Sequence, residues 1–139
     1  MDSFKSICIS LLCNWIIVSC GGSPPMNTSN VQSSQGIMKI QPQKYNFGSV
    51  NKNIHEKVKH DIVLNNIGDK MITIKNVDVS CGCISAKVES NTILPGSSIK
   101  LTFEINTSNQ LGYFNKVIYV DSDAKNSLEL IRVKGEIVE

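Results

Sequence analysis

Apolar and polar residues alternate along most of the chain from residue 37 onward. The segment "SIKLTFEIN" shows the pattern best, because Ile99, Leu101, Phe103 and Ile105 alternate with polar or charged neighbours. A period of two places the apolar side chains on one face of a β-strand, and no segment shows the spacing of an amphipathic helix. The pattern therefore predicts an all-β domain. The same alternation occurs at Val58, His60, Ile62 and Leu64, at Ile72 and Ile74, at Ile84, Ala86 and Val88, and at Ile118 and Val120.

Turn-forming residues separate these runs at short intervals. They occur in "NNIGD" (65–69), in the Pro-Gly pair at 95–96, in "TSNQLG" (107–112) and in "DSDAKNS" (121–127). About seven short strands in about 100 residues is the pattern of an immunoglobulin-like β-sandwich. Unlike an antibody domain, this part of the chain has no Trp and no cysteines placed to join two sheets. We expect a core of aliphatic residues that also includes Phe47, Phe103, Phe114 and some of the tyrosines.

The first nineteen residues have the pattern of a targeting segment. Lys5 precedes "ICISLLCNWIIV" (7–18), which is almost entirely apolar. A membrane-spanning helix needs about 20 apolar residues, whereas the core of a signal peptide needs only about 7 to 15. The following "IVSC" (17–20) resembles the lipobox of bacterial lipoproteins, which implies cleavage after Ser19 and a lipid on Cys20. The alternative is a plain secretory signal that is cut nearby.

We therefore expect three parts in the chain. These are a lipoprotein signal peptide at 1–19, the lipidated Cys20 with a flexible tether at 20–36, and an immunoglobulin-like β-sandwich at 37–139. The segment 21–36 has no charged residue and consists mainly of Gly, Ser, Pro, Asn and Gln, which is the composition of a flexible linker. It lacks the acidic cluster that sends some lipoproteins to the cell surface. The expected location is the bacterial cell envelope, at the periplasmic face of the outer membrane.

Composition and charge argue against several classes of function. The net charge is only +2, and the basic residues are scattered singly, so we expect no nucleic-acid partner and no polybasic membrane patch. The sequence has two histidines, contains neither GxSxG nor HExxH, and disperses its carboxylates. We therefore expect no catalytic residues, no enzymatic activity and no cofactor.

Only one pair of cysteines remains in the mature protein. Of the five cysteines, two leave with the signal peptide and Cys20 becomes a thioether, so that Cys81 and Cys83 are the remaining thiols. The bacterial envelope is an oxidising place, where a nearby pair can form a disulfide. In an extended strand the Cα atoms of residues i and i+2 lie about 6.6 Å apart, at the upper edge for a disulfide. We expect Gly82 to use dihedral angles closed to other residues and so bring the two sulfurs together.

Three interpretations of Cys81 and Cys83 stay open: structural thiols or a static disulfide, a redox-active pair, and a metal site. A strained disulfide is easily reduced. A reactive cysteine needs a lowered pKa, however, and no Arg or His lies within five residues of the pair. Zinc needs four donors, for which His55 and His60 are candidates, and Met71 could complete a copper(I) site. The structural alternative for His60 is a core or rim histidine with a satisfied hydrogen bond, and for His55 a solvated loop.

Five segments occur in this order along the chain: "YNFGSV", "LNNIGDKMITIKNVDVSCGC", "ILPGSSIKLTFEINT", "LGYFNKVIYV" and "VKGEIV". Their order resembles the pattern of the family called domain of unknown function 1573 (DUF1573). The resemblance covers nearly the whole domain. Its most specific part is the CGC followed by PG, and Ile62 departs from it where the pattern often has an aromatic residue. It implies an immunoglobulin-like sandwich related to eukaryotic ASH and MSP modules, in a lipoprotein, and no known biochemical activity. The matching residues are Phe47, Gly48, Val50, Asn66, Gly68, Cys81, Gly82, Cys83, Pro95, Gly96, Gly112 and Gly135.

Most of these matching residues have a backbone explanation. Gly68 and Gly96 follow turn-forming residues, and we expect both to adopt a positive φ. Tyr113 and Phe114, beside Gly112, are interpreted as the entry to a core strand, and the alternative is an exposed aromatic anchor for a partner.

The sequence thus favours a non-enzymatic, lipid-anchored envelope protein that acts as an interaction or scaffold module. Its expected partner is a protein or an envelope polymer, recognised through loops or an exposed strand edge. The alternative is a periplasmic thiol-redox or metal-binding protein that uses Cys81 and Cys83.

Overall fold

The structure is a computed structural model that describes residues 34–139. The expected signal peptide at 1–19, the expected lipidation site Cys20 and most of the expected tether lie outside the described residues. All regular secondary structure in 34–139 is β-strand, and this part of the chain has no helix that is long and apolar enough to cross a membrane.

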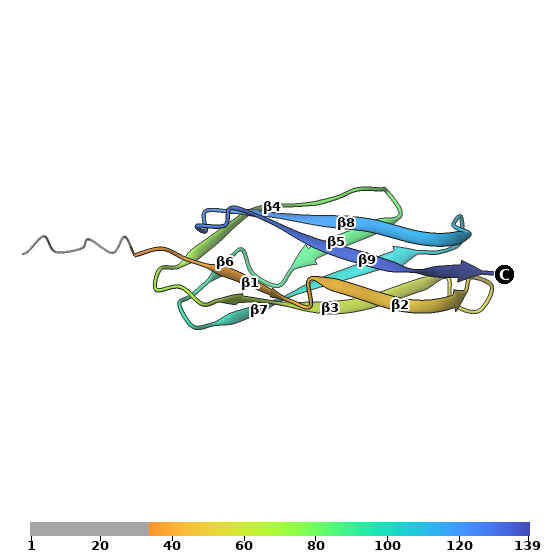
Figure 1. Cartoon of the computed structure of the whole chain (residues 1–139), viewed down its shortest axis with the longest axis horizontal. Helices are drawn as coiled ribbons and strands as arrows, with labels where there is room; N and C mark the ends of the chain where they lie inside the picture. The colour runs from red at the N-terminus through yellow and green to blue at the C-terminus, as the bar shows by residue number, and fades with distance from the viewer. Residues whose placement is uncertain (1–33) are drawn as a thin grey trace, which may run out of the picture. The chain divides into compact units, whose positions relative to one another are not determined.

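Two β-sheets pack face to face, as Figure 1 shows. One sheet has the strand order β1-β3-β7-β5 and the other has the order β2-β9-β8-β4-β6. The predicted all-β, immunoglobulin-like sandwich is confirmed, although 34–139 contain nine strands rather than the expected seven or so. The strands are Met38–Gln41 (β1), Lys44–Asn51 (β2), Lys57–Asn66 (β3), Ile72–Val79 (β4), Ile84–Val88 (β5), Thr92–Ile93 (β6), Ser98–Asn106 (β7), Gly112–Ser122 (β8) and Leu128–Val138 (β9).

The two additional strands have a topological origin. The first extended segment is divided at Pro42, after a cis Gln41–Pro42 peptide bond. Before this point β1 pairs antiparallel with β3, and after it β2 pairs parallel with β9 in the opposite sheet. Within residues 34–139, the short β6 pairs only with Ile72 and Thr73 of β4. The inward positions shift from Met38 and Ile40 to Tyr45 and Phe47 across Pro42, so the alternation is interrupted there. This interruption does not by itself show that the two halves join different sheets.

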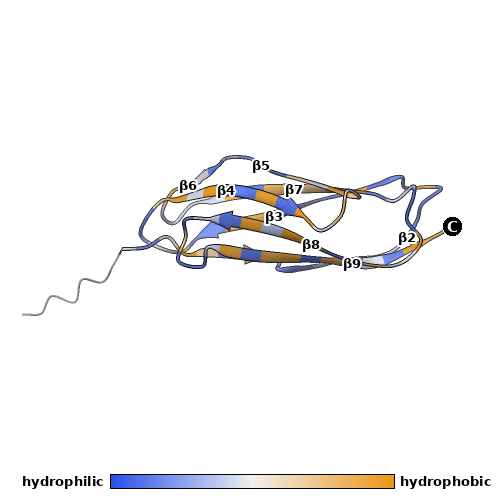
Figure 2. Ribbon diagram, turned by 90° about the horizontal axis from the view of Figure 1, so that it is seen from above, coloured by the Kyte–Doolittle hydropathy of each residue, from blue (hydrophilic) through white to orange (hydrophobic). Residues whose placement is uncertain are grey.

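The core lies between the sheets and is built from the alternating residues. Along β7, Leu101, Phe103 and Ile105 are fully buried while their neighbours face solvent, and Figure 2 shows the corresponding alternation of hydrophobic and hydrophilic residues along the strands. Ile62 and Leu64 of β3 pair with Leu101 and Ile99 in register, so that the same face of both strands enters the core. The largest fully buried side chains are Phe103, Ile62, Leu64, Ile72, Ile93, Leu101, Ile105, Ile118, Ile131 and Ile137.

Asn66, a residue of the family pattern, is a buried hydrogen-bonding centre at the end of β3. Its side chain is only 1% exposed, and its Nδ2 donates to the carbonyl oxygens of Lys70 (2.7 Å) and Ile93 (3.0 Å). Its Oδ1 accepts hydrogen bonds from the backbone N–H groups of Gly68 (3.0 Å) and Ile37 (3.4 Å). One amide therefore joins the entry to β1, the turn after β3 and the strand β6. This explains structurally why the pattern has Asn at this position.

Phe47 and Gly135 form a second structural pair of the family pattern. Asn46 pairs with Lys134 and Ser49 pairs with Glu136, so that Phe47 and Gly48 together oppose the single residue Gly135. This is a β-bulge, and its Gly48 has φ of 72°. The bulge turns the ring of Phe47 onto Gly135, where a side chain would collide with the ring. The ring also meets Phe114 edge to face, with 5.6 Å between the centroids.

The glycines of the turns divide into two groups. Gly96 has φ of 70°, as expected, and Gly112 has φ of 83°. The expectation of a positive φ for Gly68 is wrong. A Cβ atom on Gly68 would instead overlap the backbone of Gln35 and Ile37, so this glycine is required for the close approach of two chain segments.

Tyr113 and Phe114 have different roles, because Phe114 is buried in the core while Tyr113 is 71% exposed. His60 is half-buried and stacks on Tyr45, with 3.8 Å between the ring centroids, and His55 lies in an exposed loop.

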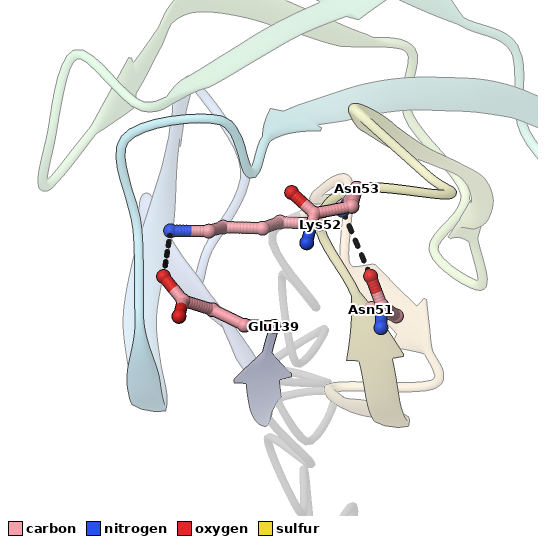
Figure 3. A network of polar contacts seen from close by, with 4 residues as sticks. All are labelled: Asn51, Lys52, Asn53 and Glu139. Atoms are coloured by element: carbon pink, nitrogen blue, oxygen red, sulfur yellow. Dashed lines mark hydrogen bonds and ion pairs between the residues drawn. The ribbon is translucent and has the colours of Figure 1, made fainter.

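The loop after β2 is tied to the end of β9, as Figure 3 shows. Lys52 forms an ion pair with Glu139 (2.9 Å), and the backbone N–H of Lys52 donates to the carbonyl of Val138 (2.9 Å). In the same loop the Asn51 side chain accepts a hydrogen bond from the backbone N–H of Asn53 (2.9 Å). The ion pair lowers the pKa of Glu139, but its carboxylate is exposed, so we expect it to contribute little to stability.

Asp123 gives the stability a component that depends on pH. The backbone N–H of Thr73 donates to its carboxylate (2.6 Å) and holds the pKa of Asp123 below its ordinary value of 3.8. A lowered folded-state pKa contributes stability above the unfolded value, and this contribution is lost as the pH falls through the folded value. We expect the melting temperature of the wild type to exceed that of Asp123→Asn at neutral pH, and the difference to shrink below pH 3.8. A difference that stays constant with pH, in thermal melts of both proteins, would contradict this assignment.

Candidate functional site

The Cys-Gly-Cys turn connects the two sheets at one end of the sandwich. Cys81 and Cys83 form a disulfide with their Cα atoms 5.2 Å apart, closer than in an extended strand. The expectation that Gly82 adopts dihedral angles closed to other residues is wrong, because its φ is not positive and a Cβ atom there would meet nothing within 4 Å. The bend is therefore compatible with other residues at this position.

Hydrogen bonds attach the two ends of this turn to different sheets. On the β4 side, the N–H of Ser80 donates to the carbonyl of Val117 in β8 (2.9 Å), and the Ser80 hydroxyl accepts from the N–H of Val117 (2.9 Å). On the β5 side, the N–H of Asn106 in β7 donates to the carbonyl of Cys83 (2.9 Å). Both cysteines are half-buried against the core. The disulfide thus lies where the chain crosses from one sheet to the other.

Replacement of both cysteines by serine is expected to lower stability. A loop this short constrains the unfolded chain only modestly, so the expected loss is about 1 to 2 kcal/mol. The measurement is the urea midpoint of the oxidised wild type and of the double variant Cys81→Ser/Cys83→Ser. An unchanged midpoint would show that the disulfide does not stabilise the crossover.

The histidines do not join the cysteines in a ligand cluster. His60 stacks between the sheets on Tyr45, His55 is in an exposed loop, and Met71 is 47% exposed in a different loop. Within residues 34–139, no group of three or more His, Cys, Asp or Glu side chains is placed to hold a metal ion.

Beyond the turn, β4 and β5 diverge and form the open side of the sandwich (Figure 1). Within residues 34–139, strand β5 pairs only with β7, and β4 has no outer neighbour beyond its short pairing with β6. The carbonyl of Cys83 and the N–H of Glu89 both bond to β7. Because an antiparallel ladder alternates, the N–H and C=O groups of Ala86 and Val88 point to the free edge. On β4, the same alternation from Ser80 directs the N–H of Val77 outward.

A groove of about 310 Å³ lies between these two edges. Apolar side chains form part of its lining, and Lys75 and Lys87 are exposed within it, while none of the lining residues is acidic. The groove therefore combines unpaired backbone groups, some apolar side chains and positive charge. It is lined by Ile74, Lys75, Asn76, Val77, Lys87, Val88 and Asn91.

The sequence pattern indicated the turn but not the groove. It placed Cys81 and Cys83 at a strand junction, and the alternation indicated both flanking strands. The free edges depend on which strands pair, and for β5 that partner is β7, beginning fifteen residues after Cys83 in the chain. The signal that could have found the groove is the pair of lysines that flank the turn, because charged residues are common on exposed edges.

The fold and this edge define an immunoglobulin-like β-sandwich with an open side between two edge strands. Residues 38–137 match the family model described as "Protein of unknown function (DUF1573)", and the chain belongs to this family. No curated protein matches the chain.

Solved structures share the fold at low sequence identity. A protein of unknown function from Porphyromonas gingivalis W83 is 20% identical with a TM-score of 0.66, over 79% of this chain and 51% of that chain. This chain thus spans about half the length of that structure. The ASH/PapD-like domain 7 of human CEP192 is 9% identical with a TM-score of 0.59, over 97% and 99% of the two chains. WR4, a member of the MSP family from C. elegans, is 11% identical with a TM-score of 0.50, over 75% and 100% of the chains. These likenesses show the fold alone.

Proposed function

We propose that the protein is a lipid-anchored, non-enzymatic interaction module of the bacterial envelope, which binds an extended segment of a partner at the β4–β5 edge. The observation that carries this proposal is the groove between two unpaired strand edges. A strand edge offers backbone hydrogen bonds to any extended chain, and the groove beside it selects the side chains of that chain. The exposed Lys75 and Lys87 favour a segment with acidic residues.

Edge binding can be tested by removal of one free donor. Ala86→Pro deletes an N–H that faces away from β7, so the β5–β7 ladder keeps its bonds, and Pro is tolerated on edge strands. A photoreactive amino acid in place of Lys75 in intact cells should cross-link to a partner, and Ala86→Pro should abolish the adduct. The matched control Ala86→Ser keeps the N–H and should keep the adduct, as judged by the shifted band. An adduct that survives Ala86→Pro would argue against strand addition.

The anchor is tested separately at Cys20. Cys20→Ala removes the thiol that would receive the lipid, and a lipid with more than one acyl chain makes membrane attachment stable. We expect the variant to move from the membrane fraction to the soluble fraction after cell breakage. A Cys20→Ala protein that stays in the membrane fraction would refute lipid anchoring and leave the edge proposal untouched.

Thiol exchange is the second candidate function, and the half-exposed disulfide in the sheet crossover supports it. A dithiol partner would attack one sulfur, form a mixed disulfide, and then release reduced Cys81 and Cys83 as it is itself oxidised. Titration in glutathione buffers distinguishes this candidate from a static bond. A redox-active pair should have a potential above about −300 mV, whereas a structural disulfide should stay oxidised.

A further inference from the structure

The outer face of the β2-β9-β8-β4 layer carries apolar side chains that nothing in 34–139 covers. On this face Tyr119 of β8 lies opposite Leu130 of β9, and Asp121 lies opposite Leu128. Leu128 is 57% exposed and Leu130 is 47% exposed, although both lie on a regular strand in the middle of a sheet. Val117 continues the row along β8. We call Val117, Tyr119, Leu128 and Leu130 the outer patch.

The charges around the outer patch are separated into two corners. The acidic corner holds Asp78 and Asp121, which line a shallow hollow beside Tyr119. The basic corner follows along β9 toward the other end of the face. It consists of Arg132 and Lys134 of β9 and of Lys44, which lies opposite Arg132 on β2. The acidic Glu136 lies beyond them on β9.

These charges are not paired with one another. The ion pairs found in residues 34–139 are Lys52–Glu139 and Lys57–Glu104, neither of which lies in the two corners. Arg132 donates to the side chain of Asn115 (3.2 Å), which carries no charge. Both corners are therefore available to a charged partner.

We propose that this face is the interface of a homodimer. An acidic corner at one end of the face and a basic corner that begins at Arg132, opposite Val117, make the face complementary to itself. A two-fold axis that lies in the interface and runs parallel to the line joining the corners would bring like corners together. An axis that lies in the interface and runs perpendicular to that line brings each acidic corner onto the basic corner of the second copy. The same rotation places the two outer patches against each other at the centre. An isologous interface requires this self-complementarity.

The size of the face fits a dissociable dimer. Ten residue pairs join β8 to β9, which corresponds to about 30 Å of strand, and four strands span about 19 Å. The resulting area of about 600 Å² per copy is somewhat below the 800 Å² or so that each partner of a standard interface buries. An apolar centre with a charged rim is the usual anatomy of such an interface.

Zero-length cross-linking of the full-length protein in membranes tests the arrangement directly. A carbodiimide joins a carboxylate to a lysine without a spacer. Asp121 pairs with Leu128, and Lys134 lies six residues further along β9. Asp121 and Lys134 of one copy are therefore about 20 Å apart, too far to be joined within that copy. We expect a dimer band that contains an Asp121–Lys134 link, identified by mass spectrometry. A dimer without links between the two corners would overturn the proposal.

Charge reversal provides the second test, in sedimentation of the full-length protein in detergent. Asp78→Lys/Asp121→Lys makes the face wholly basic, and Arg132→Glu/Lys134→Glu makes it acidic. Each variant alone should dimerise about 100-fold more weakly, because like charges then meet. An equimolar mixture of the two should dimerise again, since opposite charges face each other at both corners.

A matched control reverses charge on the opposite face of the sandwich. Lys39→Glu/Lys100→Glu changes two exposed lysines of the β1-β3-β7-β5 sheet and should leave the dimer intact. Far-ultraviolet circular dichroism confirms that each variant is folded, and recovery in the mixture confirms it independently. A monomeric wild type would contradict the proposal. Dimers that persist in both charge-reversed variants would also contradict it, because they would indicate association through lipid.

Discussion

Asn66→Ala is expected to lower the free energy of unfolding by about 3 to 5 kcal/mol, since it leaves several buried backbone groups without a partner. The lost bonds are those from Nδ2 to the carbonyls of Lys70 and Ile93, and those that Oδ1 accepts from Gly68 and Ile37. The bond to Ile93 is buried, and the other three bonds are partly buried. A loss of this size is a large part of the 5 to 15 kcal/mol or so that stabilises a typical domain.

The neighbouring Asn65 provides the matched control for this prediction. Its side chain donates to the carbonyl of Lys39 (3.2 Å) and accepts from the hydroxyl of Ser98 (2.7 Å), but both bonds lie at the exposed surface, where water can replace them. Asn65→Ala should therefore cost less than about 1 kcal/mol. Urea denaturation of both variants measures the difference. Equal losses for the two residues would show that Asn66 is not the hydrogen-bonding centre of this end of the sandwich.

Gly135→Ala is expected to cost about 2 to 3 kcal/mol, because the added methyl group forces the ring of Phe47 out of its position. Phe47 rests on Gly135 and meets Phe114 edge to face, so its displacement also disrupts that aromatic contact. The bulge at Gly48 limits how far the backbone can follow.

A double-mutant cycle with Phe47→Ala isolates this contact. In the Phe47→Ala background the ring is absent, and Gly135→Ala should then cost only a few tenths of a kcal/mol, so that the two substitutions are strongly non-additive. Gly82→Ala is a suitable control, because an added methyl group would meet no atom within 4 Å and the φ of Gly82 is not positive. Additive costs for Phe47→Ala and Gly135→Ala would mean that the ring does not determine the need for glycine at 135.

Local patterns were sufficient for the class of fold. The alternation in "SIKLTFEIN" correctly predicted which residues of β7 enter the core, because side chains on a strand alternate between faces whatever the partner strand is. The turns at 65–69 and 107–112 were also found, since their Gly and Asn residues favour the required backbone conformations. The order of motifs led to the DUF1573 family, which the match over 38–137 confirms.

Other features depended on residues that are distant in the chain. The alternation is interrupted at Pro42, but it could not show that the two halves of this segment join different sheets, because that depends on their pairing with β3 and β9. It could not show that Gly68 is required by the approach of Gln35 rather than by its own φ. The buried role of Asn66 likewise requires Ile93, which is 27 residues away in the chain.

The sequence alone determined the period of the strands, the positions of the turns and the single pair of cysteines after residue 36, because each of these follows from residues within a short window. Only the tertiary structure decided which strands pair, which edges stay free and which exposed side chains gather on one face. The open groove at β4 and β5 and the two charged corners around Tyr119 and Leu130 are products of that pairing. Strand order is set by the burial of all apolar faces together, and no single segment encodes it.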